Sequence, residues 1–331
     1  MRVLVTGGAG FIGSGFVLRA SERRPDWQIT VLDALTYAAH PASLDPVTDR
    51  VDLVKGSVTD PDLVDQLVAE HDVVVHFAAE SHNDNSLDEP WPFVDTNVIG
   101  TFRVLEAVRR HGTRLHHIST DEVYGDLALD DPSRFTEGTP VNPSSPYSAT
   151  KASADLLVRA WIRSFAIPAT LSSCSNNYGP RQHVEKFIPR QITGILDGVR
   201  PKLYGAGTNV RDWIHVDDHN DAVIAILEQG RLGETYLIGA DGETSNRDVV
   251  ALLLDLMGKP ADWFDLVNDR PGHDLRYAID SSKLRAETDW QPRYRDLRAG
   301  LAATIDWYRE HESWWRDAKV EAERIYSRLG R

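Results

Sequence analysis

The sequence is poor in cysteine, in long apolar runs and in positive charge. Cys174 is the only cysteine among 331 residues, which excludes an internal disulfide and a cysteine-rich metal site. No run approaches the roughly 18 apolar residues of a transmembrane helix, and the first expected strand starts at Arg2, which leaves no room for a signal peptide. The 36 Lys and Arg against 50 Asp and Glu give a net charge of -14, which disfavours nucleic acid and anionic membranes as partners. We therefore expect a soluble, cytoplasmic protein that binds neither.

What is present is the composition of a globular protein, with 41% hydrophobic and 26% charged residues. A chain of this length is expected to form about two domains. In the first half, short β-branched runs alternate with longer amphipathic stretches, a pattern typical of βαβ units around a parallel sheet. The expected strands are residues 3–5, 29–32, 51–54, 73–77, 115–118 and 169–173, and the expected helices are 11–23, 63–70, 94–110 and 147–165.

The second half has a less regular pattern. Residues 125–146 contain four prolines and predict a long ordered loop, a kind of segment that is often functional. Beyond residue 175 we expect a smaller α/β domain, and the tail 314–331 alternates in charge and predicts an exposed helix. The expected elements of this half are a strand at 235–238 and helices near 216–227, 246–257 and 297–310.

A glycine-rich turn joins the first strand to the first helix. Glycines at positions 7, 10 and 13 permit a tight turn and bring a pyrophosphate close to the free N–H groups of the helix N-terminus. Asp33 follows twenty residues after Gly13, where a carboxylate accepts hydrogen bonds from an adenosine ribose and repels a 2′-phosphate. The sequence therefore predicts a dinucleotide site for NAD rather than NADP. The G-x-x-G-x-x-G spacing resembles that of the extended short-chain dehydrogenase/reductase superfamily.

The predicted fold class is therefore α/β, a Rossmann-type doubly wound parallel sheet with a smaller C-terminal α/β substrate domain. We expect residues 1–175 to form the NAD-binding domain and residues 176–331 the substrate domain. Part of 211–240 is expected to pack back on the first domain.

Tyr147 and Lys151 lie four residues apart on an expected helix, so both side chains project from one face. A nearby ammonium and an oxidised nicotinamide are expected to lower the tyrosine pKa from its ordinary value of about 10. Alone, this spacing also fits a solvated helix face. Beside a dinucleotide motif it resembles the superfamily's catalytic pair, in which Tyr147 takes the proton of a sugar hydroxyl and Lys151 also holds the nicotinamide ribose.

Residues 117–125 leave the C-terminal end of an expected strand, where open α/β sheets place their ligands. Consecutive carboxylates usually mark an acidic surface loop, but Asp121 and Glu122 directly follow an apolar strand and the hydroxyls of Ser119 and Thr120. Two adjacent carboxylates in one cleft have their pKa values pushed apart, which supplies an acid and a base side by side. Hydride transfer alone has no use for both groups.

Seven segments together resemble the dTDP-glucose 4,6-dehydratase family, from residue 2 to about residue 315. They are S-T-D-E-V-Y-G at 119–125, A-A-E-S-H at 78–82, P-Y-S-A-T-K at 146–151, C-S-N-N-Y-G-P at 174–180, E-K-F-I-P at 185–189, V-R-D-W-I-H-V-D-D at 210–218 and R-P-G-H-D at 270–274. The Thr-Asp-Glu triplet is the specific part, because epimerases and decarboxylases of this fold usually lack the acidic pair.

The resemblance implies a reaction that uses NAD+ and returns it unchanged. Tyr147 removes the proton of the C4 hydroxyl of dTDP-glucose, with Thr120 hydrogen-bonded nearby, while hydride passes from C4 to the nicotinamide. Glu122 then removes the acidified C5 proton and Asp121 protonates the departing C6 hydroxyl. Hydride returns to C6 and a proton to C5, and the products are dTDP-4-keto-6-deoxy-D-glucose and water.

The resemblance also implies the residues that bind each ligand. The cofactor set is Gly7, Gly10, Phe11, Ile12, Gly13, Asp33, Ala34, Leu35, Thr36, Ser57, Val58, Phe77, Ala78, Ala79, Ser81, Thr96, Tyr147, Lys151 and Asn177. The substrate set is Ser81, Thr120, Asn176, Lys186, Phe187, Lys202, Leu203, Tyr204, Arg211, Asn246, His273 and Tyr277. Most of the polar members would hold the nucleoside diphosphate, and Tyr204 would lie against the base. A homodimer through helices 94–110 and 147–165 is implied as well.

The sequence departs from the family pattern at several positions. N-D-N at 83–85 stands where the family has V-D-R, so an arginine near the cleft is absent. Ser57 replaces an aspartate expected at the adenine amine. Leu275 replaces one of two arginines, which leaves Arg276 alone at the diphosphate end. The loop at 127–138 is another place where this chain differs.

Other functions remain open at this point. A nucleotide-sugar 4-epimerase needs NAD and the Tyr/Lys pair without the acidic pair, and a UDP-glucose 4,6-dehydratase differs by room for one methyl group. A decarboxylase needs a cationic carboxylate clamp, for which no candidate is present. A non-catalytic NAD-binding regulator would not need the Thr-Asp-Glu/Tyr-Lys set. The histidines at 82, 111, 116, 117, 183 and 215 have no metal-site spacing, so no metal is expected.

Overall fold

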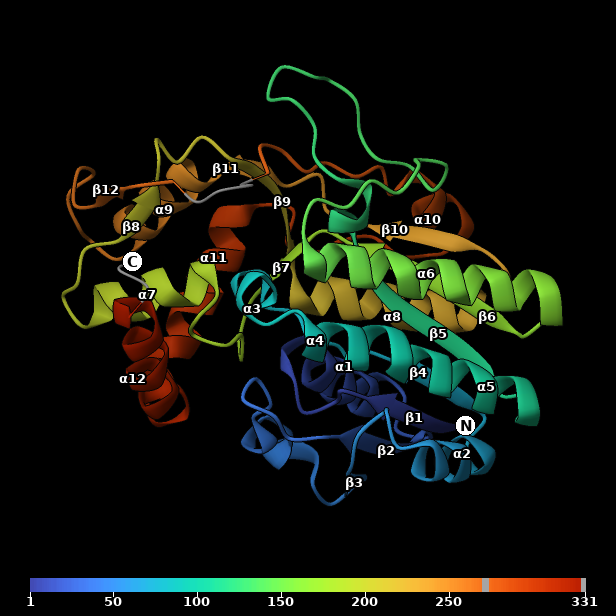
Figure 1. The fold of residues 1–331 in the computed structure, drawn as a ribbon. Helices are drawn as coiled ribbons and strands as arrows, with labels where there is room; N and C mark the ends of the chain where they lie inside the picture. Colours follow the sequence, from blue (N-terminus) through green and yellow to red (C-terminus); the bar gives the residue numbers. More distant parts are fainter. Residues whose placement is uncertain (270–273, 329–331) are drawn as a thin grey trace.

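A parallel sheet forms the centre of the larger part of the molecule (Figure 1). The structure is a computed structural model and describes residues 1–269 and 274–328. The strands of this sheet are β1 (Arg2–Thr6), β2 (Gln28–Asp33), β3 (Val51–Lys55), β4 (Val73–His76), β5 (Arg114–Thr120), β6 (Ala169–Cys174) and β10 (Thr235–Ile238). Their order is β10-β6-β5-β4-β1-β2-β3, and every neighbouring pair runs parallel. The predicted Rossmann-type doubly wound sheet is confirmed.

Helices cover both faces of this sheet, because its strands are apolar on both sides. The helices are α1 (Phe11–Arg23) and α8 (Val216–Gln229) on one face, and α2 (Pro61–Glu70), α5 (Thr101–His111) and α6 (Pro146–Phe165) on the other. In β1, Val3 and Val5 belong to the core with α1 and α8, whereas Leu4 belongs to the core with α2, α5 and α6. This alternation is the two-residue period of a strand buried on both faces.

The start of α6 is defined by its cap. Ser145 and Ser148 form a reciprocal capping box, in which the Ser148 backbone N–H donates to Ser145 Oγ over 3.1 Å, and Pro146 occupies the first helical position. The helix ends at Ala166, which is in the left-handed conformation. This cap places Tyr147 in the first turn, at the end of α6 nearest the carboxyl ends of the strands.

Two elements that follow the predicted boundary at residue 175 belong to the central sheet and its helical layer. The strand β10 pairs with β6, and α8 packs on α1. Both fall largely within 211–240, the stretch expected to pack back on the first domain. The boundary itself stays a prediction.

The remaining described elements are short segments of the first half of the chain, α10, and the elements of a smaller α/β part around a third core. They are η1 (Pro41–Val47), α3 (Asn83–Asp88), α4 (Trp91–Phe93), η2 (Val94–Gly100), η3 (Asp121–Tyr124), β7 (Asn176–Tyr178), α7 (Phe187–Leu196), β8 (Lys202–Tyr204), β9 (Val210–His215), β11 (Glu243–Ser245), α9 (Asn246–Leu256), β12 (Asp265–Val267), α10 (Ser282–Glu287), α11 (Leu297–Glu310) and α12 (Glu312–Arg328), of which the first five lie in the first half of the chain. The third core combines α7, α9, α11 and α12 with residues of β7, β8 and β9.

Two expectations about helices need correction. The expected continuous helix at 94–110 is π-helical over η2 and α-helical only from Thr101. The tail α12 is not wholly exposed, because Trp315 is 1% exposed in the third core and its indole N–H donates to the Tyr308 carbonyl over 2.8 Å. Because the charges of the tail alternate, the sequence predicts exposure and does not reveal this apolar stripe. Within residues 1–269 and 274–328, no helix is long and apolar enough to cross a membrane.

Candidate active site

Two adjoining cavities lie at the carboxyl ends of the central strands. The larger, of about 330 Å³, is lined by the glycine turn, by the segments after β2, β4 and β5, and by the first turn of α6. The smaller, of about 230 Å³, is lined mainly by residues that follow β6 and by α3. Both are lined by Ser81, Glu122, Asn176, Asn177, Gln182, Glu185 and Lys186. Their shared wall makes them suited to two ligands that react with each other.

The glycine turn leaves no room for side chains. At Gly7, where φ is +70°, an added Cβ would lie 2.6 Å from the Ala78 nitrogen, and at Gly13 it would lie 2.2 Å from the Gly7 carbonyl oxygen. Gly10 caps α1 without a side-chain hydrogen bond, and the first turn of α1 holds no acidic residue. The uncapped N–H groups of this turn therefore border a cavity where an anion can accept from them. These residues fit the pyrophosphate of NAD.

Asp33 lies at the end of β2 and lines the larger cavity. Its two carboxylate oxygens also accept from backbone N–H groups, Oδ2 from Ala9 over 2.9 Å and Oδ1 from Leu35 over 2.8 Å. The carboxylate thus holds the turn after β2 against the glycine turn. Leu35 itself has a left-handed φ of 55°. Its side chain packs against the core that β1 shares with α1 and α8, so it does not line the cavity.

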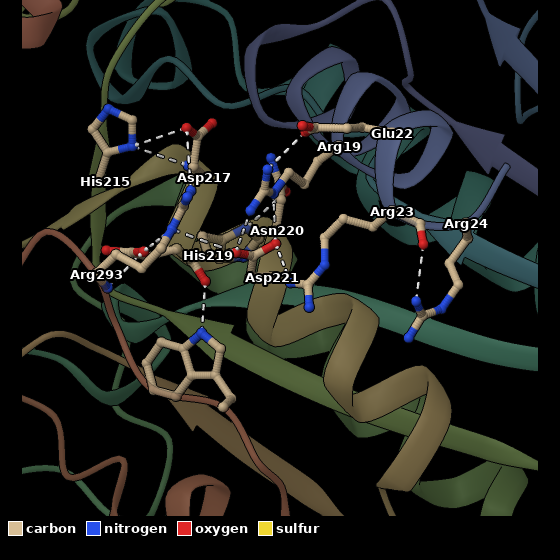
Figure 2. A network of polar contacts seen from close by, with 12 residues as sticks. Arg19, Glu22, Arg23, Arg24, His215, Asp217, His219, Asn220, Asp221 and Arg293 are labelled. Atoms are coloured by element: carbon tan, nitrogen blue, oxygen red, sulfur yellow. Dashed lines mark hydrogen bonds and ion pairs between the residues drawn. The ribbon is translucent and has the colours of Figure 1, made fainter.

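A polar network on α8 holds the first turns of α1 in place. The fully buried Asn220 donates from Nδ2 to the Ile12 carbonyl over 3.3 Å. About two turns further along α1, Arg19 forms two hydrogen bonds with Asp221, of 2.7 and 3.0 Å. Figure 2 shows Arg19 and Arg23 of α1 reaching towards this same carboxylate of α8. The orientation of the glycine turn is therefore fixed from the opposite side of the helix.

Tyr147 and Lys151 both border the larger cavity, as their spacing predicts. Lys151 Nζ donates to the Ile118 carbonyl over 2.7 Å, and burial lowers the pKa of the ammonium while Asp155 opposes that change. The predicted lowering of the Tyr147 pKa is wrong for the chain alone. Burial, followed by the nearby Glu122, raises the pKa of Tyr147 well above its ordinary value, and a hydrogen bond with Thr120 only partly opposes this. The loss of solvation on burial is the largest cause of this shift.

The acidic pair sits at the junction of the two cavities on η3. Asp121 is 1% exposed, and burial raises its carboxyl pKa well above the usual range, with Glu122 and Asp212 acting in the same direction. Thr120 starts η3, accepting the Glu122 backbone N–H and donating to Asp121 Oδ1, both over 3.3 Å. The raised pKa favours the protonated form of Asp121, which is the form that a general acid needs. Glu122 is half-buried, lines both cavities and accepts from Asn83 Nδ2 over 3.2 Å.

Cationic and aromatic side chains line the smaller cavity. Lys186 Nζ donates to the Ser81 carbonyl over 3.0 Å, which ties the segment before α7 to the loop after β4. The Arg211 guanidinium lies 4.3 Å from the centre of the Tyr277 ring and donates to the Asp274 carbonyl over 3.0 Å. A stacked, fixed guanidinium of this kind suits the recognition of a diphosphate.

Most residues of the predicted site lie around these cavities. All of the cofactor set except Leu35 line the larger cavity, which also includes Thr120. The rest of the substrate set lines the smaller cavity, apart from two members. Leu203 is wholly buried in the third core, because β8 turns it away from the cavity, and His273 lies outside the described residues.

Arg276 is a further correction. It was expected to remain as the cation of the diphosphate end. Its guanidinium instead pairs with Glu243 over 2.6 Å, and it does not line either cavity. The adjacent Leu275 is 44% exposed. The replacement of an arginine by Leu275 therefore does not alter the described walls of the two cavities.

Some lining residues were not predicted from the sequence. They are, among others, Glu80, His82, Asn83, Gln182, Glu185 and Trp213. Glu80 and His82 lie within the A-A-E-S-H segment and Glu185 begins E-K-F-I-P, so their motifs were the available signal. Asn83 was noted only as a departure. Among residues 1–269 and 274–328, no cluster of histidine, cysteine and carboxylate side chains is arranged to hold a metal ion.

Comparison with known proteins identifies the class of enzyme that this fold and this site define. A model of the family described as GDP-mannose 4,6 dehydratase matches residues 4–302, and the chain belongs to that family. The dTDP-glucose 4,6-dehydratase of Mycobacterium tuberculosis (strain CDC 1551) is 66% identical over 330 residues, covering 100% of both chains. The predicted resemblance is confirmed.

Solved structures of similar proteins agree in fold. The dTDP-glucose 4,6-dehydratase of Streptomyces venezuelae, determined with NAD bound, has a TM-score of 0.91 and 44% identity, covering 96% of this chain and 100% of that one. The dTDP-glucose 4,6-dehydratase of Bacillus anthracis, in complex with NAD, has a TM-score of 0.90 and 43% identity, covering 96% of this chain and 99% of that one.

Proposed function

We propose that this chain is an NAD-dependent dTDP-glucose 4,6-dehydratase, a lyase that forms dTDP-4-keto-6-deoxy-D-glucose and water. The observation that carries the proposal is the acidic pair on η3. Asp121 is buried with a raised pKa, and Glu122 lies next to it at the junction of the two cavities. A neutral acid and a neighbouring carboxylate are the two groups that an elimination of water requires.

The larger cavity is proposed to hold NAD+ and the smaller one the nucleotide of the substrate. When bound, NAD+ supplies an acceptor for the hydride of C4 and later returns that hydride to C6. The glycine turn and the first turn of α1 bind the pyrophosphate through backbone N–H groups. The sugar then lies across the shared wall, where Ser81 and Glu122 face both ligands.

Each proton is handled by a residue at this wall. Tyr147 accepts the proton of the C4 hydroxyl, helped by its hydrogen bond with Thr120. Lys151 binds the nicotinamide ribose, and the positive charges beside the phenol oppose the effect of burial on its pKa. Glu122 accepts the C5 proton once C4 is a ketone, and Asp121 donates a proton to the departing C6 hydroxyl, which leaves as water. A proton returns to C5 when the hydride reaches C6.

A 4-epimerase would use the same cofactor and the same Tyr/Lys pair. It would have no use for a protonated carboxylic acid beside a carboxylate, so the geometry of η3 favours dehydration. The choice of thymidine over uridine rests on the names of the similar proteins. It depends on contacts with one methyl group of the base.

We also propose that the enzyme acts in the cytoplasm as a homodimer. The helices α5 and α6 lie side by side on the flank of the sheet (Figure 1) and are the surface proposed for pairing. Leu156 and Phe165 of α6 are 54% and 43% exposed and would offer apolar area to a partner helix. Sedimentation of the purified protein tests it, with a monomeric mass as the contrary result.

The reaction itself is tested by incubating the purified protein with dTDP-glucose, with and without added NAD+, and following the mass of the substrate. We expect loss of one water molecule and no net NADH. A new stereoisomer of unchanged mass would instead indicate an epimerase. Faster conversion of UDP-glucose than of dTDP-glucose would correct the assigned base, and no reaction with either sugar would refute the proposal.

A further inference from the structure

The residue that contacts the proposed base Glu122 from across the cavity is Asn83. Its Nδ2 donates to Glu122 Oε2 over 3.2 Å, and both side chains line the smaller cavity. The carboxylate is thus held from an element that is distant in the sequence. None of the steps assigned above uses Asn83.

Both ends of this contact are rigidly supported. Asn83 is the first residue of α3, where its carbonyl accepts from Ser86 Oγ over 2.6 Å and His82 caps the helix. The helix α3 in turn lies against α6, which carries Tyr147. Glu122 is in the first turn of η3, with its backbone N–H on Thr120. The hydrogen bond therefore joins two fixed backbones.

We propose that Asn83 is a positioning residue for the general base: its amide N–H directs the Glu122 carboxylate into the substrate cavity and keeps it in the ionised, proton-accepting form. A donor to a carboxylate stabilises the charged form over the neutral acid. The inference rests on the proposed function, since it concerns the step in which the C5 proton is removed.

The ionisable groups around Glu122 are of both signs. Groups that interact with it electrostatically include Asp121 on η3, Tyr147 on α6 and Tyr277 in the segment after residue 273. The other ionisable groups that line the same cavity are His82, Asp84, Glu185, Lys186, Arg190, Lys202, Tyr204 and Arg211. Asn83 adds to this set an uncharged donor with direct contact to the carboxylate. Its contribution therefore changes neither the net charge of the site nor its attraction for a diphosphate.

The test replaces Asn83 with valine, which removes the amide, and with aspartate, which keeps its size and replaces the donor with an acceptor. The matched control is Asn85→Val, because Asn85 lies in the same helix and its Nδ2 donates instead to the Tyr37 hydroxyl over 3.4 Å. Stopped-flow absorbance of the reduced nicotinamide reports C4 oxidation, and quenched-flow mass spectrometry reports water loss. Both are measured across a range of pH.

We expect C4 oxidation at the wild-type rate in N83V and N83D, and water loss slowed by about ten-fold or more, the size of a hydrogen bond to a charged group. The acidic limb of the rate of water loss should move to higher pH, since Glu122 is protonated more readily. N85V should match the wild type in the rate of C4 oxidation, in the rate of water loss and in the pH of the acidic limb.

Several results would overturn the inference. One is water loss in N83V and N83D at the wild-type rate with an unmoved limb. Another is an equal slowing of both steps with the limb unmoved, which would mean that Asn83 only packs the site. A third is the same shift in N85V. If N83V does not fold, as judged by circular dichroism, the rate of water loss and the acidic limb of N83D decide whether the inference holds. If the wild-type protein itself loses no water from dTDP-glucose, it is the proposed function that fails.

Discussion

Replacing Asp121 with asparagine should stop water loss and leave C4 oxidation intact. Burial beside Glu122 and Asp212 raises the pKa of Asp121, which favours the protonated form that can supply a proton to the departing C6 hydroxyl. The amide has the shape and the neutral charge of that protonated acid but cannot release a proton. A positioned general acid contributes roughly 10²–10⁴-fold in rate, and the rate of water loss should fall by about that factor. Tyr147 and Lys151 are unchanged and still support oxidation.

The same substitution should stabilise the protein at alkaline pH. Because folding raises the pKa of Asp121, the folded protein binds this proton more tightly than the unfolded chain. The free energy of unfolding of the wild type therefore falls as the pH rises from the unfolded pKa, about 3.9, towards the raised folded value. D121N has no such loss. The hydrogen bond from Thr120 to Oδ1 is retained by the amide oxygen, so in acid the two proteins should differ by no more than about 1 kcal/mol.

Rapid mixing with dTDP-glucose separates the two effects on activity, with absorbance of the reduced nicotinamide for oxidation and mass spectrometry for water loss. Thermal unfolding at acidic and alkaline pH measures the effect on stability. The reasoning is refuted if D121N eliminates water at the wild-type rate. It is equally refuted if the difference in unfolding temperature between D121N and the wild type does not grow with pH.

Three other changes test the remaining parts of the structure. Gly13→Ala should abolish NAD binding in equilibrium dialysis, because the added Cβ would lie 2.2 Å from the Gly7 carbonyl oxygen; normal binding would show that the turn can widen. Asn220→Ala should weaken NAD binding by about ten-fold in calorimetry, because the Ile12 carbonyl loses its donor, and unchanged affinity would contradict the role given to α8. Trp315→Ala should lower the free energy of unfolding by about 3–5 kcal/mol in denaturant titrations, and a smaller loss would place the tail outside the core.

The central sheet is predictable from the sequence because its signals are local. Each strand is a short apolar run, and each helix that follows has an amphipathic period or a recognisable cap, as at Ser145 before α6. The partner of β10 is not local, because the pairing of Thr235 with Leu171 depends on how the chain returns to the sheet. Trp315 shows the same limit, since the charges around it predict exposure while its partners lie on α11 and other elements.

In the site, spacing predicts which side chains share a surface, and packing decides what they do there. Tyr147 and Lys151 border one cavity as the helical period requires, yet the pKa of Tyr147 moves upward, chiefly because of burial and then of Glu122. Arg276 has the chemistry of a phosphate ligand, but it pairs with Glu243. Asn83 interrupts the family pattern, and only the folded chain shows that its amide meets the proposed base. Each of these outcomes depends on a neighbour that is distant in the sequence.

The acid of the proposed reaction depends on both parts of the molecule. Asp121 is carried by the central sheet through β5 and η3, whereas Asp212, which raises its pKa, is carried by β9 in the smaller sheet. Asp212 is itself 1% exposed and accepts the Gly242 backbone N–H over 2.9 Å, and burial raises its pKa to about 6. Arg211, the next residue along β9, opposes the shift at Asp121. The pKa of Asp121 is therefore raised first by burial and by Glu122 on the same element, and the smaller sheet adds to this shift through Asp212.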